Sequence, residues 1–246
     1  MPPSDEARQE DSRVRAARTK RERTRRALLD AAEASFSSRG WAETRMEDIA
    51  AAAGVSAATA YNHFPSKHLL VGQIYRPLVR PLLAQAERDI AAERPVVAAL
   101  CDQVEALARI SSRYRKLTAS FYAAVQEYTI RVARLPDPAD EFDPRILAPV
   151  PEPIRLLVEH GQRDGRLRPF PSPEEASGMT ASLLLLRSLN RPDEPPDATA
   201  EVLLTMLFGM LRPELLVGSG VDGRPFRHLH GDHPLGSGST IGTGGA

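Results

Sequence analysis

The sequence predicts an all-helical fold, on the basis of three observations. Apolar residues recur at spacings of three and four along most of the chain, which is the period of one helix face. Proline and glycine separate these periodic segments from one another. Beyond residue 76, no segment alternates between apolar and polar residues as a half-buried strand does. The chain has 246 residues, 42% of them hydrophobic, which is enough for one or two buried cores.

The first helix is expected over about residues 19–38. Leu28, Ala32 and Phe36 lie on one face of that helix, and Gly40 stands just beyond it as a stop. Residues 1–12 are polar and acidic and contain two prolines, so we expect them to be disordered.

A helix-turn-helix pattern follows the first helix. Thr44 and Glu47 have the spacing of a capping box, which predicts a short helix at 45–52. Gly54 ends this helix in a tight turn, and Ser56 is expected to cap another short helix that runs through Asn62. Such a pair of helices presents the second one to the DNA major groove. The same pattern also occurs in helical proteins that bind no DNA, so by itself it leaves both interpretations open.

Proline-rich breaks separate the remaining helices. A fourth helix is expected to begin at Ser66, and Pro77 and Pro81 are expected to kink or break it. The segment 136–153 holds six prolines and is expected to be a long loop. Further helices are expected over about residues 95–112, 113–135, 154–163, 173–189 and 198–211.

Charge is distributed unevenly along the chain. The 32 basic and 32 acidic residues balance, but residues 13–26 hold eight basic residues and one acidic residue. A basic run is most often a solvated face of the protein. Directly before a helix-turn-helix pattern, however, it favours an anionic partner such as DNA.

The sequence argues against several other classes of protein. No uncharged apolar run is long enough for a membrane span, and the charged N-terminal segment does not resemble a secretory signal, so we expect no membrane partner. The single cysteine, Cys101, fits a reducing cytoplasm. No phosphate loop, zinc spacing or nucleophile motif is present, so we expect neither an enzyme nor a cofactor.

The strongest competing signal is a possible metal site near the C-terminus. His228, His230, Asp232 and His233 are potential metal ligands. They lie within residues 218–246, which contain 9 of the 16 glycines and no periodic apolar pattern. Such a segment is expected to be a disordered tail with little to hold ligand geometry. We therefore expect no functional metal site.

The residues after Gly40 resemble a known family at many positions at once. The matching residues are Gly40-Trp-Ala-Glu-Thr44-Arg-Met-Glu-Asp48-Ile49-Ala50, Ala53-Gly54-Val55-Ser56, Thr59, Tyr61, His63-Phe64, Ser66-Lys67 and Leu70. This pattern resembles the N-terminal domain of the tetracycline-repressor (TetR) family of bacterial transcription regulators. The resemblance covers roughly residues 18–72, with weaker similarity at residues 161–168.

The resemblance implies a domain organisation and a function. The implied organisation is a disordered basic arm at 1–17, a helix-turn-helix DNA-binding domain at 18–72, a helical ligand-binding and dimerisation domain at 73–217 and a glycine-rich disordered tail at 218–246. The implied function is that of a transcription regulator, most simply a repressor. It would bind a palindromic DNA operator as a homodimer and be released by a small-molecule effector.

The resemblance also implies which residues meet DNA. Asn62 is expected to pair with adenine and Arg45 with guanine, while Ala57 or Ala58 touches a thymine methyl. Thr59 completes the base-facing set. The residues expected at phosphates are Thr44, Tyr61, His63 and Lys67, with Arg18 and Arg25 from the basic arm following the backbone or entering the minor groove. Thr44 would equally serve as a helix cap, and Tyr61 as part of the core.

The C-terminal domain is expected to hold the ligand and the dimer interface. Its last two helices are apolar on nearly all sides, which predicts burial on more than one side. The interface is expected to include Leu183, Leu186, Leu203, Leu207 and Met210. A ligand pocket, for an apolar or aromatic molecule, is expected to be lined by Cys101, Val104, Thr118, Phe121, Tyr122, Val125, Tyr128 and His160. Alternatively, the last two helices are buried within one protomer rather than at an interface. The residues assigned to the pocket are then ordinary core residues.

Two other functions remain open. Ala57, Ala58 and Ala60 leave the predicted reading helix few side chains that hydrogen-bond to bases. The second hypothesis is therefore a dimeric small-molecule or protein-interaction module with weak or no sequence-specific DNA binding. A helical enzyme using the C-terminal domain is a third hypothesis, which no catalytic motif supports.

Overall fold

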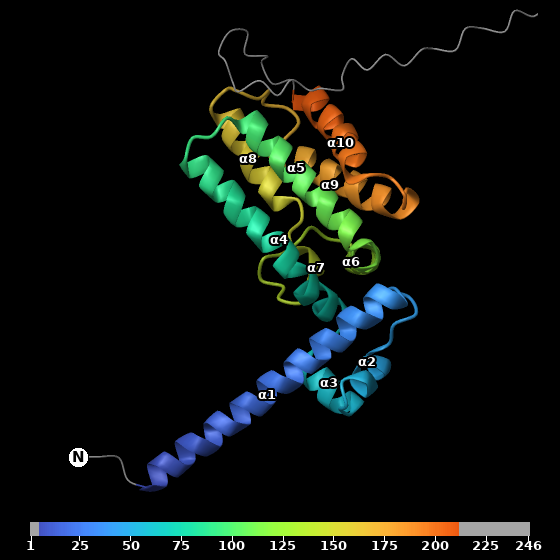
Figure 1. The fold of residues 1–246 in the computed structure, drawn as a ribbon. Coiled ribbons are helices and arrows are strands. Elements are labelled where there is room, and N and C mark those ends of the chain that lie inside the picture. Colours follow the sequence, from blue (N-terminus) through green and yellow to red (C-terminus); the bar gives the residue numbers. More distant parts are fainter. Residues whose placement is uncertain (1–4, 212–246) are drawn as a thin grey trace, which may run out of the picture. The chain divides into compact units, whose positions relative to one another are not determined.

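The computed structural model describes residues 5–211, and their side chains from residue 15 onward. Ten helices and no strand make up this part of the chain, so the predicted all-helical fold is confirmed (Figure 1). The helices are α1 (Asp5–Ser38), α2 (Met46–Ala52), α3 (Ala57–His63), α4 (Lys67–Ala91), α5 (Val96–Arg113), α6 (Arg115–Val132), α7 (Pro144–Leu147), α8 (Glu152–Arg163), α9 (Pro173–Asn190) and α10 (Pro196–Leu211). The predicted glycine-rich tail and its histidines lie outside the described residues.

Helix α1 begins earlier than expected. It starts at Asp5 rather than near residue 19, so the expectation of disorder over residues 1–12 is wrong for residues 5–12. Residues 4–39 contain neither proline nor glycine, which favours one continuous helix. Ion pairs at i and i+4, such as Arg18 with Glu22 at 2.9 Å, add to this preference.

The helices α1, α2 and α3 form one small core. Leu28, Phe36, Ile49 and Phe64 are all fully buried in it. Between α2 and α3 the backbone turns through Gly54, whose φ of +70° lies in the left-handed region that glycine adopts without strain. This core holds the helix-turn-helix pair as a unit.

One predicted cap is present and another is wrong. Ser56 caps α3, because its hydroxyl accepts from the backbone N–H of Thr59 at 3.2 Å. The capping box at Thr44 does not form. Helix α2 begins one residue later, at Met46, and the residue before it, Arg45, makes no side-chain cap. The Thr44 hydroxyl instead donates to the carbonyl of Gly40 at 2.7 Å.

Helix α4 continues through both of its prolines. The predicted break at Pro77 and Pro81 is wrong, because the helix runs unbroken from Lys67 to Ala91. Both prolines are exposed, so water can reach the backbone carbonyls that lose their N–H partners. The opposite face, which includes Tyr75 and Val79, is buried and holds the helix in place. The predicted domain boundary between residues 72 and 73 therefore falls within one continuous helix.

The long proline-rich loop contains a short helix that the sequence analysis missed. Helix α7 begins with Pro144, and the carboxylate of Asp143 accepts from the backbone N–H of Arg145 at 2.8 Å. An aspartate followed by proline is an ordinary helix-start signal. The six prolines of this segment obscured that signal, because they suggested a loop throughout.

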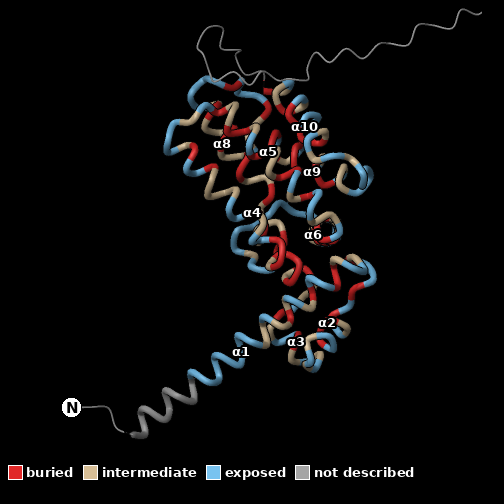
Figure 2. The backbone as a smooth tube through the Cα atoms, in the orientation of Figure 1, coloured by how far each residue is buried: buried red, intermediate tan, exposed pale blue. Residues whose placement is uncertain are grey.

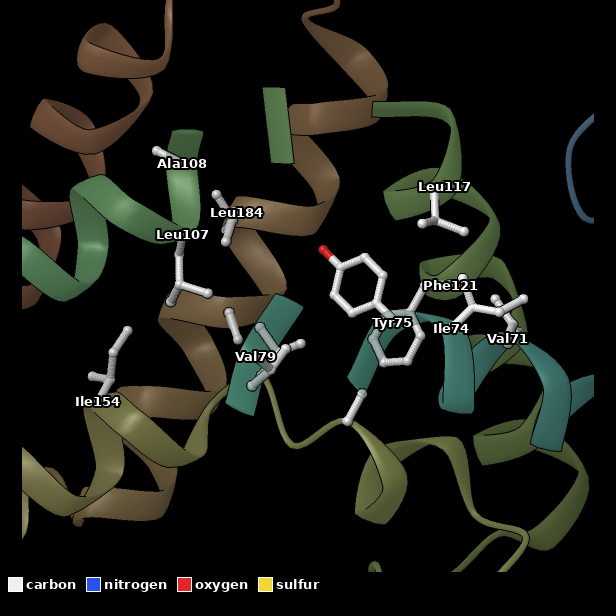
Figure 3. Packing of buried hydrophobic residues seen from close by; sticks show 14 of the residues in the cluster. Val71, Ile74, Tyr75, Val79, Leu107, Ala108, Leu117, Phe121, Ile154 and Leu184 are labelled. Carbon is white, nitrogen blue, oxygen red and sulfur yellow. The ribbon is translucent and has the colours of Figure 1, made fainter. Parts of the chain in front are cut away.

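Residues from Val71 onward build the core of the larger helical region. Tyr75 of α4 stacks on Phe121 of α6, with ring centroids 4.3 Å apart (Figure 3). The same hydrophobic cluster continues to one side of this pair through α5, α8 and α9, with Leu107, Ile154 and Leu184 (Figure 3). In the part of the chain that the structure describes, no helix is long and apolar enough to span a membrane.

Candidate functional site

Helix α3 presents most of its surface to solvent. Ala60 is the only buried residue of this helix (Figure 2). Ala58 and Asn62 are exposed, whereas Ala57 and Thr59 are half-buried. The Thr59 hydroxyl lies 2.9 Å from that of Ser56, so part of its hydrogen-bonding capacity is used at the helix cap. The exposed Asn62 amide is free of such a local role and suits bidentate hydrogen bonding to a base edge.

Side chains of α2 support this exposed surface. Arg45 is exposed just before α2 begins, as a side chain that reaches a base edge must be. The hydroxyl of Tyr61 donates to the carboxylate of Glu47 on α2 at 3.2 Å. Desolvation raises the pKa of this tyrosine, and the Glu47 carboxylate raises it further. Tyr61 therefore ties α3 to α2 while it stays 42% exposed.

The basic part of α1 lies beside the end of α3. The guanidinium of Arg25 sits 4.5 Å from the centroid of the Phe64 ring. Desolvation lowers the pKa of His63, and the charges of Arg21 and Arg25 lower it further. Arg18, one helical turn before Arg21, is exposed and pairs with Glu22. Positive charge from α1 therefore adjoins the exposed face of α3.

Thr44 does not suit the phosphate contact expected of it. The residue is only 1% exposed, and its hydroxyl proton is donated to the carbonyl of Gly40. A hydroxyl with its proton engaged inside the protein cannot donate to a phosphate oxygen. The expectation of a phosphate contact from Thr44 is therefore wrong for this conformation.

Lys67 has a structural role that the sequence did not reveal. Its ammonium donates to the carbonyls of Trp41 and Thr44, at 2.8 and 3.0 Å, and lies 4.0 Å above the Trp41 ring. Desolvation lowers its pKa, against the opposite influence of Glu127. Two of its three N–H donors are engaged, so at most one remains for a phosphate.

A buried histidine follows Lys67 at the start of α4. His68 is 5% exposed and packs edge-on against the rings of Trp41 and Tyr128, at 4.9 and 5.5 Å. Its Nε2 atom has no hydrogen-bond partner and lies 3.4 Å from a carboxylate oxygen of Glu127. Burial lowers the pKa of His68, while Glu127 raises it less strongly and Arg131 and Lys67 lower it.

Acidification from pH 7.5 to 5.5 is expected to destabilise the protein through His68. An unfolded histidine titrates near pH 6.5, and burial places the pKa of folded His68 below that value. Below about pH 6.5 the unfolded chain thus binds more protons than the folded chain. The free energy of unfolding therefore decreases as the pH is lowered. Thermal melts at the two pH values should show a smaller loss of melting temperature in His68→Gln than in the wild type. Equal losses would contradict this assignment.

The residues expected to line a ligand pocket do not share one cavity. Thr118 and Phe121 lie with Tyr75 in the core, where the Tyr75 and Thr118 hydroxyls are 3.1 Å apart. Tyr128 lies at the other end of α6 and donates to Asp140 at 2.6 Å. Desolvation, together with this hydrogen bond, raises the pKa of Tyr128 to about 12.

The other five predicted pocket residues are also dispersed or already in use. His160 pairs with Asp164 at 3.2 Å on α8. Val104 is buried in α5, and burial raises the pKa of the Cys101 thiol to about 11. Tyr122 and Val125 are half-buried on α6. Packing and local hydrogen bonds therefore occupy the side chains that the sequence assigned to a ligand.

Two open cavities of about 400 Å³ each lie elsewhere in the described residues. The first is lined by Arg168, Phe170, Pro171, Glu175, Met179, Gly209 and Met210. The second is lined by Arg134, Asp137, Ala139, Asp140, Glu141 and Phe142. Neither includes a residue that the sequence assigned to a ligand, and no group of three potential metal ligands occurs between residues 5 and 211.

Helices α9 and α10 each carry an exposed apolar stripe opposite their buried face. Leu186 and Val202 are 43% and 40% exposed, while Leu183 and Met210 are half-buried. The stripe on α9 comprises Met179, Leu183, Leu186 and Leu189, and that on α10 comprises Val202, Met206 and Met210. These spacings of three and four place each stripe on one helix face.

Two residues expected at the dimer interface are buried in their own protomer. Leu203 and Leu207 are 1% and 0% exposed and face the core shared by α5, α9 and α10. Placing them on a partner-facing surface was wrong. A helix that is apolar on all sides does not reveal which side faces its own core.

Comparison with known protein families matches the N-terminal helices. Residues 28–74 match the family model described as bacterial regulatory proteins, tetR family. This segment contains α2, α3, the end of α1 and the start of α4.

Two curated relatives extend this similarity. The HTH-type transcriptional repressor KstR2 of Rhodococcus jostii is 34% identical over 109 residues, which are 44% of this chain and 50% of that protein. The HTH-type transcriptional regulator BetI of Agrobacterium fabrum is 32% identical over 124 residues, which are 50% of this chain and 46% of that protein. The chain thus spans about half the length of the curated relatives it matches.

A solved structure resembles a larger part of the chain. It is the crystal structure of Thermus thermophilus FadR, described as a TetR family transcriptional repressor in complex with lauroyl-CoA. The TM-score is 0.59 at 26% identity, and the match covers 80% of this chain and 100% of that one. The similarity therefore reaches beyond the helix-turn-helix helices into the region from α4 onward.

Proposed function

We propose that this chain, which belongs to the tetR family of bacterial regulatory proteins, regulates transcription by binding a palindromic DNA operator as a homodimer. The two curated relatives described above are transcription regulators, and one of them and the structural neighbour FadR are repressors, so repression is the proposed direction. Such a regulator acts in the bacterial cytoplasm, where the DNA lies.

The exposed face of α3 is the observation that carries this proposal. A buried core holds α3 in place, yet only Ala60 of its seven residues is buried. Asn62 and Ala58 face solvent on this helix, and Arg21 and Arg25 of α1 lie near its last residue, His63. A rigidly held helix with an open face and adjoining cations is what major-groove reading requires.

The helical form of α1 favours phosphate contacts for the basic arm. Residues 15–26 lie within one continuous helix, and Arg18, Arg21, Arg23 and Arg26 are exposed on it. A helix is too wide for the minor groove of ordinary duplex DNA, which is about 6 Å across. The arm is therefore proposed to follow the phosphate backbone beside the operator, which increases the salt dependence of binding.

Release by a small apolar or aromatic effector is the second part of the proposal. Thermus thermophilus FadR was crystallised with lauroyl-CoA, which carries a long apolar chain. In this chain the apolar core around Tyr75 and Phe121 joins α4 to α6, and α4 begins beside the helix-turn-helix. A ligand that separates these helices would act on DNA binding through α4.

Selection from random duplex DNA at about 150 mM salt tests the proposal, because weak phosphate attraction is suppressed there. The expected result is an enriched palindrome. Binding that appears only at low salt and enriches no sequence would favour the alternative, a dimeric small-molecule or protein-interaction module. The alanine-rich surface of α3, with Ala57 and Ala58, is the observation that favours this alternative.

Asn62→Ala is expected to change the sequence preference at one base position. Because Asn62 is exposed and its side chain makes no hydrogen bond or ion pair with the described residues, the melting temperature should stay within about 2 °C of the wild type. Loss of a bidentate base contact should reduce discrimination at that position by about 1–3 kcal/mol. Repeating the selection with the variant measures this change. A uniform loss of affinity for all sequences would show instead that Asn62 contacts phosphate.

A further inference from the structure

A hydrogen bond joins the helix-turn-helix to α6, a helix far away in the sequence. The indole N–H of Trp41, in the turn between α1 and α2, donates to a carboxylate oxygen of Glu127 at 2.7 Å. The ring of Trp41 stacks on that of Phe36, with centroids 5.7 Å apart, and Trp41 is 7% exposed. Glu127 is the acceptor in this pair although its own side chain is 55% exposed.

A second bond runs from the same face of α6 to the end of α1. The hydroxyl of Ser120 donates to the backbone carbonyl of Phe36 at 3.1 Å, and both residues are buried. Ser120 and Glu127 are seven residues apart, which is two helical turns, so they lie on one face of α6. This face therefore holds the helix-turn-helix at two points.

Glu127 also faces the start of α4. Its second carboxylate oxygen lies 3.4 Å from Nε2 of His68, and His68 packs edge-on against Trp41. The Lys67 ammonium lies over the Trp41 ring and donates to the carbonyl of that residue at 2.8 Å. One carboxylate on α6 therefore adjoins both the turn before α2 and the first turn of α4.

The same helix contributes to the core that joins α4 to α6. Phe121 follows Ser120 directly and stacks on Tyr75, while Thr118 lies within hydrogen-bonding distance of the Tyr75 hydroxyl. A shift or rotation of α6 in this core would move Glu127 relative to Trp41. The hydrogen bond between Glu127 and Trp41 thus connects α6 to the helix-turn-helix directly, and not by way of α4.

We propose that Glu127 is a positioning residue for DNA binding, which fixes the orientation of the helix-turn-helix through Trp41. This rests on the proposed function, since the orientation matters because two subunits must meet two half-sites. Nothing in the arrangement requires Glu127 to touch DNA. Its effect is on which half-site spacing the dimer accepts.

Glu127→Ala tests this role, with Glu127→Gln as the conservative variant and Gln126→Ala as the control. Glutamine keeps an oxygen that accepts from the indole, whereas alanine does not. Gln126 is an exposed neighbour on the same helix, so its replacement by alanine controls for changes in helix propensity. Trp41 is the only tryptophan of the chain, which makes its fluorescence a specific reporter of this contact.

The spacing preference is the ratio of affinities for the operator with the best half-site spacing and for one altered by a single base pair. In Glu127→Ala this ratio is expected to fall about tenfold, because a misoriented reading helix loses part of its base contacts. The salt dependence should stay unchanged, because no phosphate contact is lost. The melting temperature should fall by no more than about 4 °C, because water can replace a half-exposed carboxylate. Glu127→Gln should retain most of the spacing preference, and Gln126→Ala all of it.

Amide hydrogen exchange of residues 40–46, without DNA, separates failure of this inference from failure of the proposed function. Exchange there should be about tenfold faster in Glu127→Ala than in Gln126→Ala, together with a shift in Trp41 fluorescence. Unchanged exchange and an unchanged spacing preference would overturn the positioning role. Equal changes in exchange throughout the chain would also overturn it, because they indicate a general structural role. If the wild type selects no sequence, the exchange result alone decides whether Glu127 positions the helix-turn-helix.

Discussion

A Leu186→Arg/Val202→Arg variant is expected to be a monomer that binds its operator at least about a hundredfold more weakly than the wild type. Each side chain is about two-fifths exposed on the apolar stripes of α9 and α10. A buried guanidinium without a partner is costly, so two of them on a partner-facing surface oppose association. A monomer reaches one half-site only and loses the base contacts of the second.

The fold of the monomer should survive this change. Neither Leu186 nor Val202 belongs to the buried core, which α10 builds with Leu203 and Leu207 on its other side. Analytical ultracentrifugation measures the mass, circular dichroism the helix content, and titration with the selected DNA the affinity. A dimer of unchanged stability would show that the apolar stripes serve another purpose.

Ile130→Arg/Leu135→Arg is the matched control. These two residues are also apolar and are 78% and 86% exposed, but they lie outside the stripes of α9 and α10. This control adds the same charge, which should strengthen non-specific attraction to DNA equally in both variants. It is expected to remain dimeric and to bind the operator as the wild type does. Weakening in the control as well would point to a general effect of the arginines.

The order of the helices could be predicted because its signals are local. The periodic apolar spacing of Leu28, Ala32 and Phe36 and the cap at Ser56 are contained within single helices or turns. The continuation of α4 through Pro77 was not predictable in this way. Whether a helix survives a proline depends on burial of its opposite face and on water at the freed carbonyl, and both depend on the whole fold.

The exposure of candidate site residues could be predicted from a local pattern, whereas their contacts with distant residues could not. Asn62 and Arg45 are exposed, as residues that read bases must be, and their contacts with DNA stay a prediction. By contrast, the bond from Trp41 to Glu127 joins residues 86 positions apart, and no local pattern indicates it. Lys67 shows the same limitation, because its bond to the carbonyl of Trp41 exists only once α4 has packed beside the turn.

Phe36→Ala is expected to destabilise the helix-turn-helix region by about 3–5 kcal/mol and to abolish specific DNA binding under conditions where this region unfolds. Phe36 is fully buried, and its ring supports that of Trp41 at 5.7 Å. Removal of the ring takes away apolar contacts and leaves a cavity in a small core, which has few other residues to fill it.

The loss should appear first in the signal of Trp41. Urea unfolding followed by tryptophan fluorescence reports the turn after α1, whereas circular dichroism reports helices throughout the chain. In Phe36→Ala the fluorescence transition should move to lower urea than the circular dichroism transition, because the core around Tyr75 and Phe121 remains intact. Both signals must be compared at one protein concentration, since dimerisation adds to the measured stability.

Phe142→Ala is the matched control, because this phenylalanine is 46% exposed and truncation leaves no enclosed cavity. It should change the free energy of unfolding by less than about 1 kcal/mol. Coincident fluorescence and circular dichroism transitions in Phe36→Ala would mean that α6 couples the two regions into one cooperative unit. Such coincidence would indicate that the contacts of α6 with Phe36 and Trp41 link the stability of the helix-turn-helix to that of the helices from α4 onward.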